Sequence, residues 1–205
     1  MPRFDLDPAA REVARLLDGV DDNRLDGPTP CADMPVAALI DHLMGLCLAF
    51  TWAARKTAPP AEGEPVGPGE ATADHLDPRW REVLPDRLRD LVAAWRDPSA
   101  WEGMTEAGGV TMPAREMGVV ALDELVLHGW DLARATGQDF NCDPASTGAV
   151  LAFTTASAQP EHAAVRAGLF GPVVPVAADA PAFDRALGFA GRDPSWTPAR
   201  ADDRA

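Results

Sequence analysis

The stretch that decides the fold spans residues 122–132 and reads Leu122-Asp123-Glu124-Leu125-Val126-Leu127-His128-Gly129-Trp130-Asp131-Leu132. Apolar residues surround its polar positions on every side, which indicates a helix largely buried in a bundle. Glu124 and His128 are four residues apart, so their side chains stack one turn apart on one face, and Asp131 follows on that face. A carboxylate and an imidazole at this spacing can reach a single cation, and both suit Zn²⁺.

A third protein ligand would have to come from elsewhere, and the chain has only four histidines. His75 adjoins a segment rich in Pro and Gly, and His162 follows a polar turn. His42 lies in the middle of a predicted helix, beside its apolar stripe, and could enter the same core layer as Glu124 and His128 in an antiparallel bundle. Three protein ligands leave a coordination position open for water or substrate.

Asp131 is expected to support such a site by orienting an imidazole or a bound water. The alternative stays open at this point: Glu124 and His128 can form an ordinary hydrogen-bonded pair, and His42 can be a partly buried histidine without a metal. Three polar groups in a bundle core need partners, because leaving them unpaired is costly, and this favours the metal.

Helical periodicity extends outward in both directions from this segment and predicts an all-α protein. Helices are predicted over residues 7–20, 33–56, 80–96, 113–136, from 144 onward, and 181–189. The expected N-caps and stop signals are Asp7, Asp33, Thr111 and Asp143, with Gly137 as a helix end. Pro85 should kink or split its helix. Gly108-Gly109 also allows a small hairpin.

The length of 205 residues suits a single domain over residues 1–205. Within it, residues 57–72 are rich in Pro, Gly, Ala and Glu and are expected to form a flexible loop. Residues 168–205 are expected to form an irregular C-terminal extension, because Gly and Pro punctuate them.

Charge and composition exclude several classes of function. The formal net charge of −14 disfavours nucleic-acid binding, since an acidic surface repels phosphate backbones. We expect no membrane span, because apolar runs fall short of about 20 residues. The N-terminus has no apolar core of a signal peptide, so cytoplasmic localisation is expected. The three cysteines form no CxxC pair and are expected to stay reduced, with Cys47 in the core.

Four segments, in order along the chain, share a pattern with a known family. Thr29-Pro30-Cys31 leads into Val36-Ala37-Ala38-Leu39-Ile40-Asp41-His42-Leu43-Met44-Gly45, and Glu124 to Gly137 has the form Glu-xxx-His-xx-Asp. Phe170-Gly171-Pro172 and Gly191-Arg192-Asp193-Pro194 follow in the same order. The chain resembles the DinB-like superfamily, within it the metal-binding-domain family of mycothiol-dependent maleylpyruvate isomerase, and there an actinobacterial subgroup.

The resemblance implies an up-down-down-up four-helix bundle with extra C-terminal helices. It also implies a divalent metal on His42, Glu124 and His128, with water completing the shell. Two departures matter. The isomerase has a further C-terminal domain, whereas only about 35 residues follow Gly171 here, which argues against isomerisation of maleylpyruvate. Met34 stands where the family pattern has tryptophan, so the pocket lining is expected to differ.

Three functions are compatible with these observations. The first is a metal-dependent thiol transferase that joins mycothiol or a similar small thiol to a small electrophile. The second is a non-catalytic metal-binding or stress-response bundle. The third is a structural or interaction bundle without metal, for which six tryptophans could serve as core or as a homodimer surface. For a site of two nitrogens and one oxygen, Zn²⁺ fits best, and Ni²⁺, Co²⁺ or Mn²⁺ are alternatives.

Overall fold

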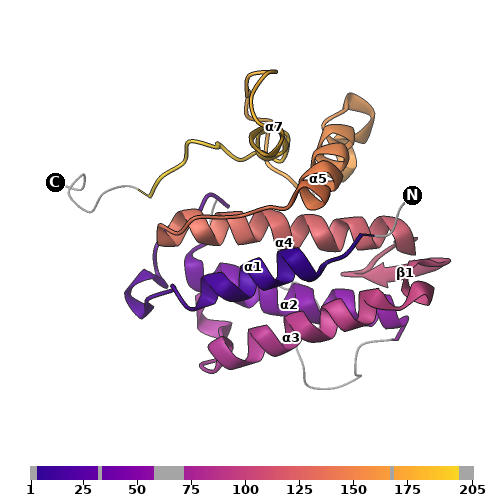
Figure 1. Ribbon diagram of the computed structural model, residues 1–205, viewed down its shortest axis with the longest axis horizontal. Helices are drawn as coiled ribbons and strands as arrows, with labels where there is room; N and C mark the ends of the chain where they lie inside the picture. Colours follow the sequence, from indigo (N-terminus) through magenta and orange to yellow (C-terminus); the bar gives the residue numbers. More distant parts are fainter. Residues whose placement is uncertain (1–3, 32–33, 58–71, 167–168, 199–205) are drawn as a thin grey trace.

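The fold is seen in a computed structural model, which describes residues 4–31, 34–57, 72–166 and 169–198. Four long helices lie side by side: α1 (Asp7–Leu17), α2 (Val36–Arg55), α3 (Trp80–Arg96) and α4 (Ala114–Thr136) (Figure 1). Helices α1 and α4 run in one direction and α2 and α3 in the other, which confirms the up-down-down-up bundle. The segment expected to be a flexible loop, residues 57–72, lies almost wholly outside the described residues.

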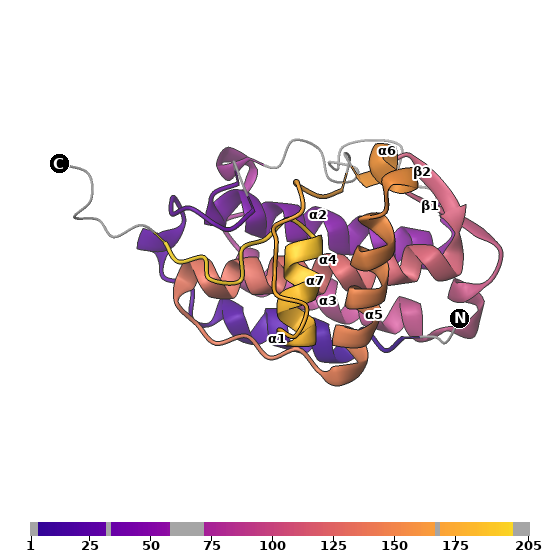
Figure 2. The same ribbon diagram turned by 90° about the horizontal axis from the view of Figure 1, so that it is seen from above.

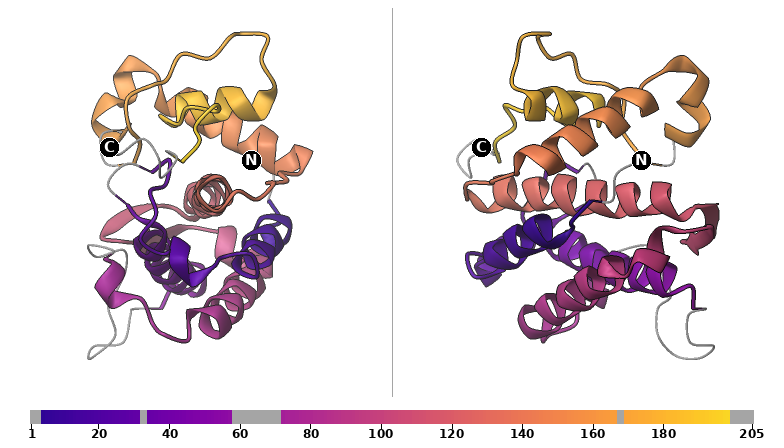
Figure 3. Two further views of the ribbon diagram at one scale, coloured as in Figure 1. Left: turned by 90° about the vertical axis from the view of Figure 1, so that its left-hand side faces the viewer. Right: turned by 45° about the vertical axis from the view of Figure 1, so that its right-hand side comes forward.

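Helix α4 lies at the centre of the molecule. Seen along the bundle, it has α1, α2 and α3 on one side and α5 (Pro144–Ser157) with α7 (Ala182–Phe189) on the other (Figure 3). Of its 23 residues, 18 are buried. A helix enclosed in this way is apolar around most of its circumference. The few polar side chains of α4 are therefore held in a low-dielectric interior, where each needs a partner.

Helices α5 and α7 form a second layer that crosses α4 (Figure 2). They pack mainly on each other and, through α5, on α4. Asp143 caps α5 as predicted: its carboxylate accepts hydrogen bonds from the backbone N–H groups of Ala145 and Ser146 at 3.0 and 3.1 Å. The short helix expected over 181–189 is α7, so the C-terminal extension contributes a structured cover rather than only irregular chain.

A β-hairpin at one end of the bundle precedes α4. Strand β1 (Met104–Ala107) pairs antiparallel with β2 (Val110–Pro113), with Ala107 opposite Val110. Gly108 and Gly109 form the two-residue turn with φ of 56° and 78°. A type I′ turn requires positive φ at both central positions, which glycine adopts readily. The small hairpin predicted at Gly108-Gly109 is therefore confirmed.

Two of the predicted N-caps, Asp7 and Thr111, were wrong, although α1 begins at Asp7 as predicted. Asp7 lies inside α1, whose N-cap position is Leu6. The helix predicted from Asp33 begins at Val36, after Pro35, and Asp33 itself lies outside the described residues. Thr111 belongs to β2, where its hydroxyl contacts Glu106, and α4 begins after Pro113. In each case packing of the apolar face, together with a proline near the boundary, sets where the helix begins.

Pro85 does not split α3, which is continuous from Trp80 to Arg96. The proline lies in the second turn, and Trp80, Leu84 and Leu88 on either side of it are buried in the core. Burial of these side chains outweighs the one hydrogen bond that a proline removes. The C-terminal end of α4 was predicted correctly, because Gly137 takes the left-handed conformation at φ 73°.

Helix α2 is long and apolar enough to cross a membrane by length and composition alone, so the expectation that apolar runs are too short was wrong for this helix. Most of it, 72%, is buried inside the molecule, as in the core helix of a bundle. Cys47 on this helix is 1% exposed, in the core as expected. Four of the six tryptophans are also buried, namely Trp80, Trp95, Trp101 and Trp130.

The remaining elements are short. Single turns of 3₁₀ helix lie at Asp22–Arg24, Ala73–His75, Pro98–Trp101 and Pro160–His162, and α6 (Ala163–Arg166) is one further helical turn.

Candidate metal centre

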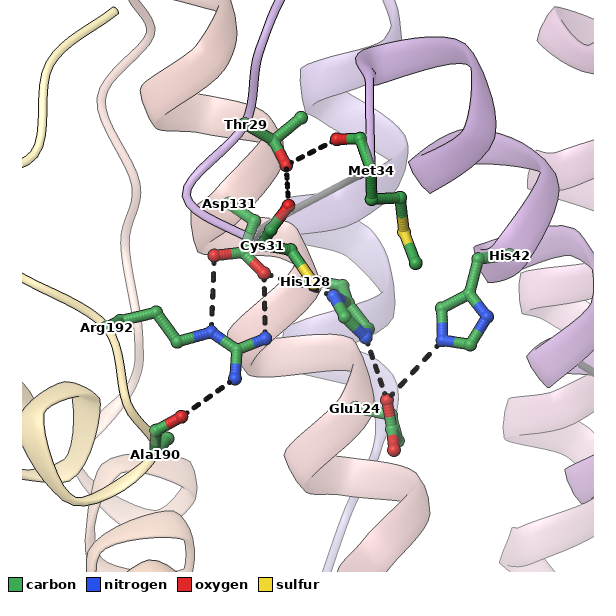
Figure 4. Close-up of polar contacts among 9 residues, drawn as sticks. All are labelled: Thr29, Cys31, Met34, His42, Glu124, His128, Asp131, Ala190 and Arg192. Atoms are coloured by element: carbon green, nitrogen blue, oxygen red, sulfur yellow. Dashed lines mark hydrogen bonds and ion pairs between the residues drawn. The ribbon is translucent and has the colours of Figure 1, made fainter. Parts of the chain in front are cut away.

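Three side chains from α2 and α4 converge on one point in the bundle (Figure 4). His128 Nε2 lies 3.0 Å from Glu124 Oε2, and His42 Nε2 lies 3.9 Å from the same oxygen. The two imidazole rings meet edge to face, with centroids 4.8 Å apart. The structure thus brings together His42, Glu124 and His128, the three residues singled out as metal ligands in the sequence.

The spacing of these ligand atoms suits a small divalent cation. All three lie within 4.8 Å of one another. Ligands about 2.0–2.1 Å from a tetrahedral metal are roughly 3.3–3.4 Å apart, a value between the two separations observed here. Two imidazole nitrogens and one carboxylate oxygen are a donor set that Zn²⁺ accepts, and other divalent transition metals bind it as well.

The protonation of the two histidines differs sharply. Burial, and then the charge of His128, lower the pKa of His42 to about 4, so its imidazole is neutral at neutral pH and one of its two ring nitrogens offers a lone pair to a metal. Burial would also lower the pKa of His128, but hydrogen bonds with Asp131 and Glu124 outweigh it and raise the pKa to about 9. Without a metal, His128 therefore holds a second proton, and a cation at Nε2 would have to replace it.

Asp131 lies behind His128 and away from the pocket. Its Oδ2 is 3.1 Å from His128 Nδ1, which fixes the ring orientation and presents Nε2 toward Glu124. The side chain of Asp131 has no exposed surface. A carboxylate behind a ligating imidazole holds its tautomer and raises its basicity, the role predicted for Asp131 from its spacing.

A buried arginine, whose role at the site was not predicted from the sequence, completes this arrangement. Arg192 Nη2 donates to Asp131 Oδ2 at 2.9 Å, and its Nε lies 3.4 Å from Oδ1. Arg192 is 7% exposed and also donates to the carbonyl oxygen of Ala190 at 3.1 Å. Burial raises the pKa of Asp131, but the charges and hydrogen bonds of Arg192 and His128 together outweigh burial and hold that pKa below its usual range. The chain Arg192–Asp131–His128 therefore runs from the C-terminal extension to the candidate metal ligands.

The turn after α7 places Arg192 at this point. Gly191 has a φ of 81°, the left-handed conformation that glycine adopts without strain. A Cβ at Gly191 would lie 2.9 Å from backbone atoms of Gly171 and Pro172. The two C-terminal motifs noted in the sequence thus touch each other, and only a residue without a side chain fits between them.

The loop before α2 closes another side of the site. The Thr29 hydroxyl lies 3.0 and 2.7 Å from the carbonyl oxygens of Cys31 and Met34 and donates its proton to them. Cys31 forms a second group of potential ligands with His128 and Asp131. This group is the weaker candidate for a metal, because Asp131 already pairs with the Arg192 guanidinium.

A pocket of about 890 Å³ opens onto the candidate ligands. His42, Glu124 and His128 form part of its lining, together with Arg192 and residues of α2, the hairpin and the segment after α6. The side chains of His42 and Glu124 keep 16% and 19% of their surface exposed, so the site is reachable from this pocket. His75 and His162, which the sequence set aside, are exposed and do not line the pocket.

Comparison with known proteins identifies a family and two relatives whose sequences are similar to this chain. A family model described as mycothiol maleylpyruvate isomerase N-terminal domain matches residues 6–133. Two uncharacterized proteins of Mycobacterium tuberculosis, Rv0738 and MT0763, are each 29% identical over 132 residues, which is 64% of this chain. The match spans 65% of the length of these relatives, less than two thirds.

A solved structure is also similar. It is the crystal structure of a histidine-to-alanine mutant of the mycothiol-dependent maleylpyruvate isomerase, with a TM-score of 0.53 and 21% sequence identity. The similarity covers 73% of this chain and 66% of that chain. At this identity the likeness concerns the fold, and it agrees with the DinB-like bundle expected from the sequence.

Proposed function

The chain belongs to the mycothiol maleylpyruvate isomerase N-terminal domain family, and on this premise we propose that it is a metal-dependent thiol S-transferase. In this proposal one divalent metal, Zn²⁺ in the first instance, binds to His42, Glu124 and His128. Mycothiol or a similar small thiol is the donor, and a small electrophile is the acceptor. The observation that carries the proposal is the convergence of three ligand atoms at the wall of a large pocket.

The donor set supports a site with an open position rather than a closed one. Three protein ligands leave room for at least one exogenous ligand on a tetrahedral metal, and the pocket lies on the open side. When bound, such a metal would act as a Lewis acid that lets a thiol bind as thiolate at neutral pH.

The residues of the chain prepare this site in three ways. His42 is kept neutral by burial, so it offers a lone pair. Asp131 accepts the Nδ1 proton of His128 in a hydrogen bond, so that Nε2 of the same ring is directed toward Glu124 and the pocket. Arg192 compensates the charge of Asp131, which keeps that carboxylate ionised in a dry interior. Most of the pocket wall is apolar, so a bound electrophile that covers it would displace water from the thiolate and strengthen the electrostatic interactions there.

The test is thiol consumption by the metal-loaded protein with mycothiol and a panel of electrophiles. We expect turnover with the parent protein. In His42→Ala the rate of thiol consumption should fall by at least about 100-fold, because a metal ligand is lost. His75→Ala is the matched control, because this histidine is exposed and lies away from the pocket.

The outcomes separate this proposal from a non-catalytic metal bundle. Strong thermal stabilisation by metal without any thiol consumption would contradict the transferase and favour the bundle whose metal only ties α2 to α4. Turnover that is equal in the parent and in His42→Ala would contradict the assignment of the metal to this site.

A further inference from the structure

The pocket in front of the candidate metal centre has a charged floor and an uncharged wall. Of the 21 described residues that line it, only five can ionise, and they lie close together: Cys31, His42, Glu124, His128 and Arg192 (Figure 4). The other lining residues are apolar or are glycine and proline. Charge on a bound molecule could therefore be recognised only at the floor.

Once a metal has replaced the second proton of His128, the side chains of the floor have no positive charge to spare. Among the described lining residues Arg192 is the one lysine or arginine, and it is tied to Asp131 at 2.9 and 3.4 Å and to a backbone carbonyl oxygen. The two charges of a divalent metal would be balanced by Glu124 and by a bound thiolate. A carboxylate entering the floor would have to draw Arg192 away from a fully buried Asp131, which is strongly unfavourable.

The wall offers apolar contacts from four parts of the chain. Phe50 lies on α2, Met117 and Val120 lie on α4, Met112 lies on the hairpin, and Leu169 lies in the segment after α6. None of these side chains can form an ion pair or a strong hydrogen bond with a ligand.

The rim of the pocket is apolar as well. Four large hydrophobic side chains are exposed among the described residues, and two of them, Val110 at 53% and Leu169 at 38%, line the pocket. A ligand with an alkyl or aryl group would cover them. The internal segments outside the described ranges, residues 32–33, 58–71 and 167–168, contain no lysine or arginine that could add a cation.

We propose that the electrophile of this protein is an uncharged, apolar molecule, whose alkyl or aryl group lies along Phe50, Met112 and Met117 with its reactive carbon toward the metal ligands. The inference rests on the proposed thiol transfer. With an enone as acceptor, the thiol sulfur bonds to the β-carbon, the electron pair of the C=C bond takes up the thiol proton at the α-carbon, and nothing leaves. A dicarboxylate such as maleylpyruvate fits this pocket poorly.

The experiment uses the metal-loaded full chain, mycothiol and three vinyl ketones: methyl vinyl ketone, pentyl vinyl ketone, and the pentyl compound with a terminal carboxylate. We expect kcat/KM to rise by up to about fourfold for each methylene that becomes buried. The carboxylate compound should be at least tenfold poorer than its neutral counterpart. A carboxylate compound that is as good as the neutral one, or better, would overturn the inference while leaving thiol transfer intact.

Two variants on the hairpin form a matched pair. Val110→Arg adds a guanidinium at the pocket rim, whereas Met104→Arg adds one to a side chain that is 57% exposed on the same hairpin but does not line the pocket. Val110→Arg should shift the preference toward the carboxylate by about two- to fivefold, as an exposed ion pair does. Met104→Arg should not shift it, and equal shifts in both variants would contradict recognition inside the pocket.

A binding measurement keeps this inference separate from the proposed function. The saturated ethyl pentyl ketone cannot react, and its binding can be followed by ligand-observed NMR. If it binds more tightly than its carboxylate analogue although no electrophile is turned over, the apolar selectivity stands and thiol transfer fails. If the two bind equally, the selectivity is refuted whatever the activity.

Discussion

Loss of the Arg192 guanidinium should destabilise the protein strongly, even without a metal. The pair with Asp131 has contacts of 2.9 and 3.4 Å, and neither side chain exceeds 8% exposure. Breaking such a pair on one side leaves a buried charge uncompensated, which costs about 3–5 kcal/mol. Asp131 keeps His128 as a partner at 3.1 Å, so the lower end applies, and we expect about 3 kcal/mol for Arg192→Met. For a chain of this size that corresponds to a fall in Tm of roughly 6–12 °C.

The assay is urea denaturation in the presence of a chelator, for Arg192→Met, Asp131→Asn and the double variant. Because the two side chains compensate each other, removing both should cost less than the sum of the single losses, by about 2 kcal/mol. Arg79→Met is the control, since Arg79 is 71% exposed and lies 3.7 Å from Asp77, where an ion pair contributes less than about 1 kcal/mol.

Two results would refute this reasoning. If Arg192→Met stays within 1 kcal/mol of the parent protein, the guanidinium does not compensate a buried charge. If the losses in the two single variants simply add, the two residues are not coupled, and the C-terminal extension does not support His128 through Asp131.

Three further predictions concern the same fold. Gly191→Ala should lower the free energy of unfolding by about 1–3 kcal/mol, because the residue has a φ of 81° and a Cβ would lie 2.9 Å from the Gly171 backbone; an unchanged urea midpoint would contradict this. Asp143→Ala should cost about 1 kcal/mol at pH 7 through the lost cap of α5. Burial acts to raise the pKa of Asp143, but the hydrogen bonds it accepts lower it below 3.8, so the cap stabilises above the unfolded pKa, and the loss in Asp143→Ala should disappear as pH falls through the folded pKa in acid denaturation. Cys47, whose thiol pKa burial raises to about 12, should not react with a thiol reagent in native protein, and Cys47→Ser should leave the native thiol count unchanged but lower the count in urea by one.

The helices were predictable because their signals are local, whereas the up-down-down-up order of the bundle was predicted from the family resemblance. Apolar periodicity located the helices, and Gly108-Gly109 and Gly137 marked a turn and a helix end through their positive φ. The N-cap residues were less predictable than the helices themselves, since side-chain caps compete with packing of the apolar face. Asp143 caps its helix, whereas Asp7 does not and Thr111 belongs to a strand.

For the candidate site as well, residues placed by local spacing were predicted and the residue placed by a long-range contact was not. Glu124, His128 and Asp131 share one helix face, so their spacing brought them together in the sequence, and His42 followed as the histidine on the neighbouring core helix. Arg192 is 61 residues from Asp131 in the chain. Its position depends on the packing of Gly191 against Gly171 in the extension, a long-range contact that periodicity does not report. Two signals were available: a fully buried aspartate requires a partner, and Arg192 lies in one of the segments that resemble the family.

The measurement that tests the central claim most directly is the metal content of untagged protein by mass spectrometry, in the parent, in His128→Ala and in the control His162→Ala. Three convergent ligand atoms predict about one divalent metal per chain in the parent and in the control, and little in His128→Ala. No metal in the parent after loading and desalting, or equal metal in His128→Ala, would contradict a metal centre at His42, Glu124 and His128.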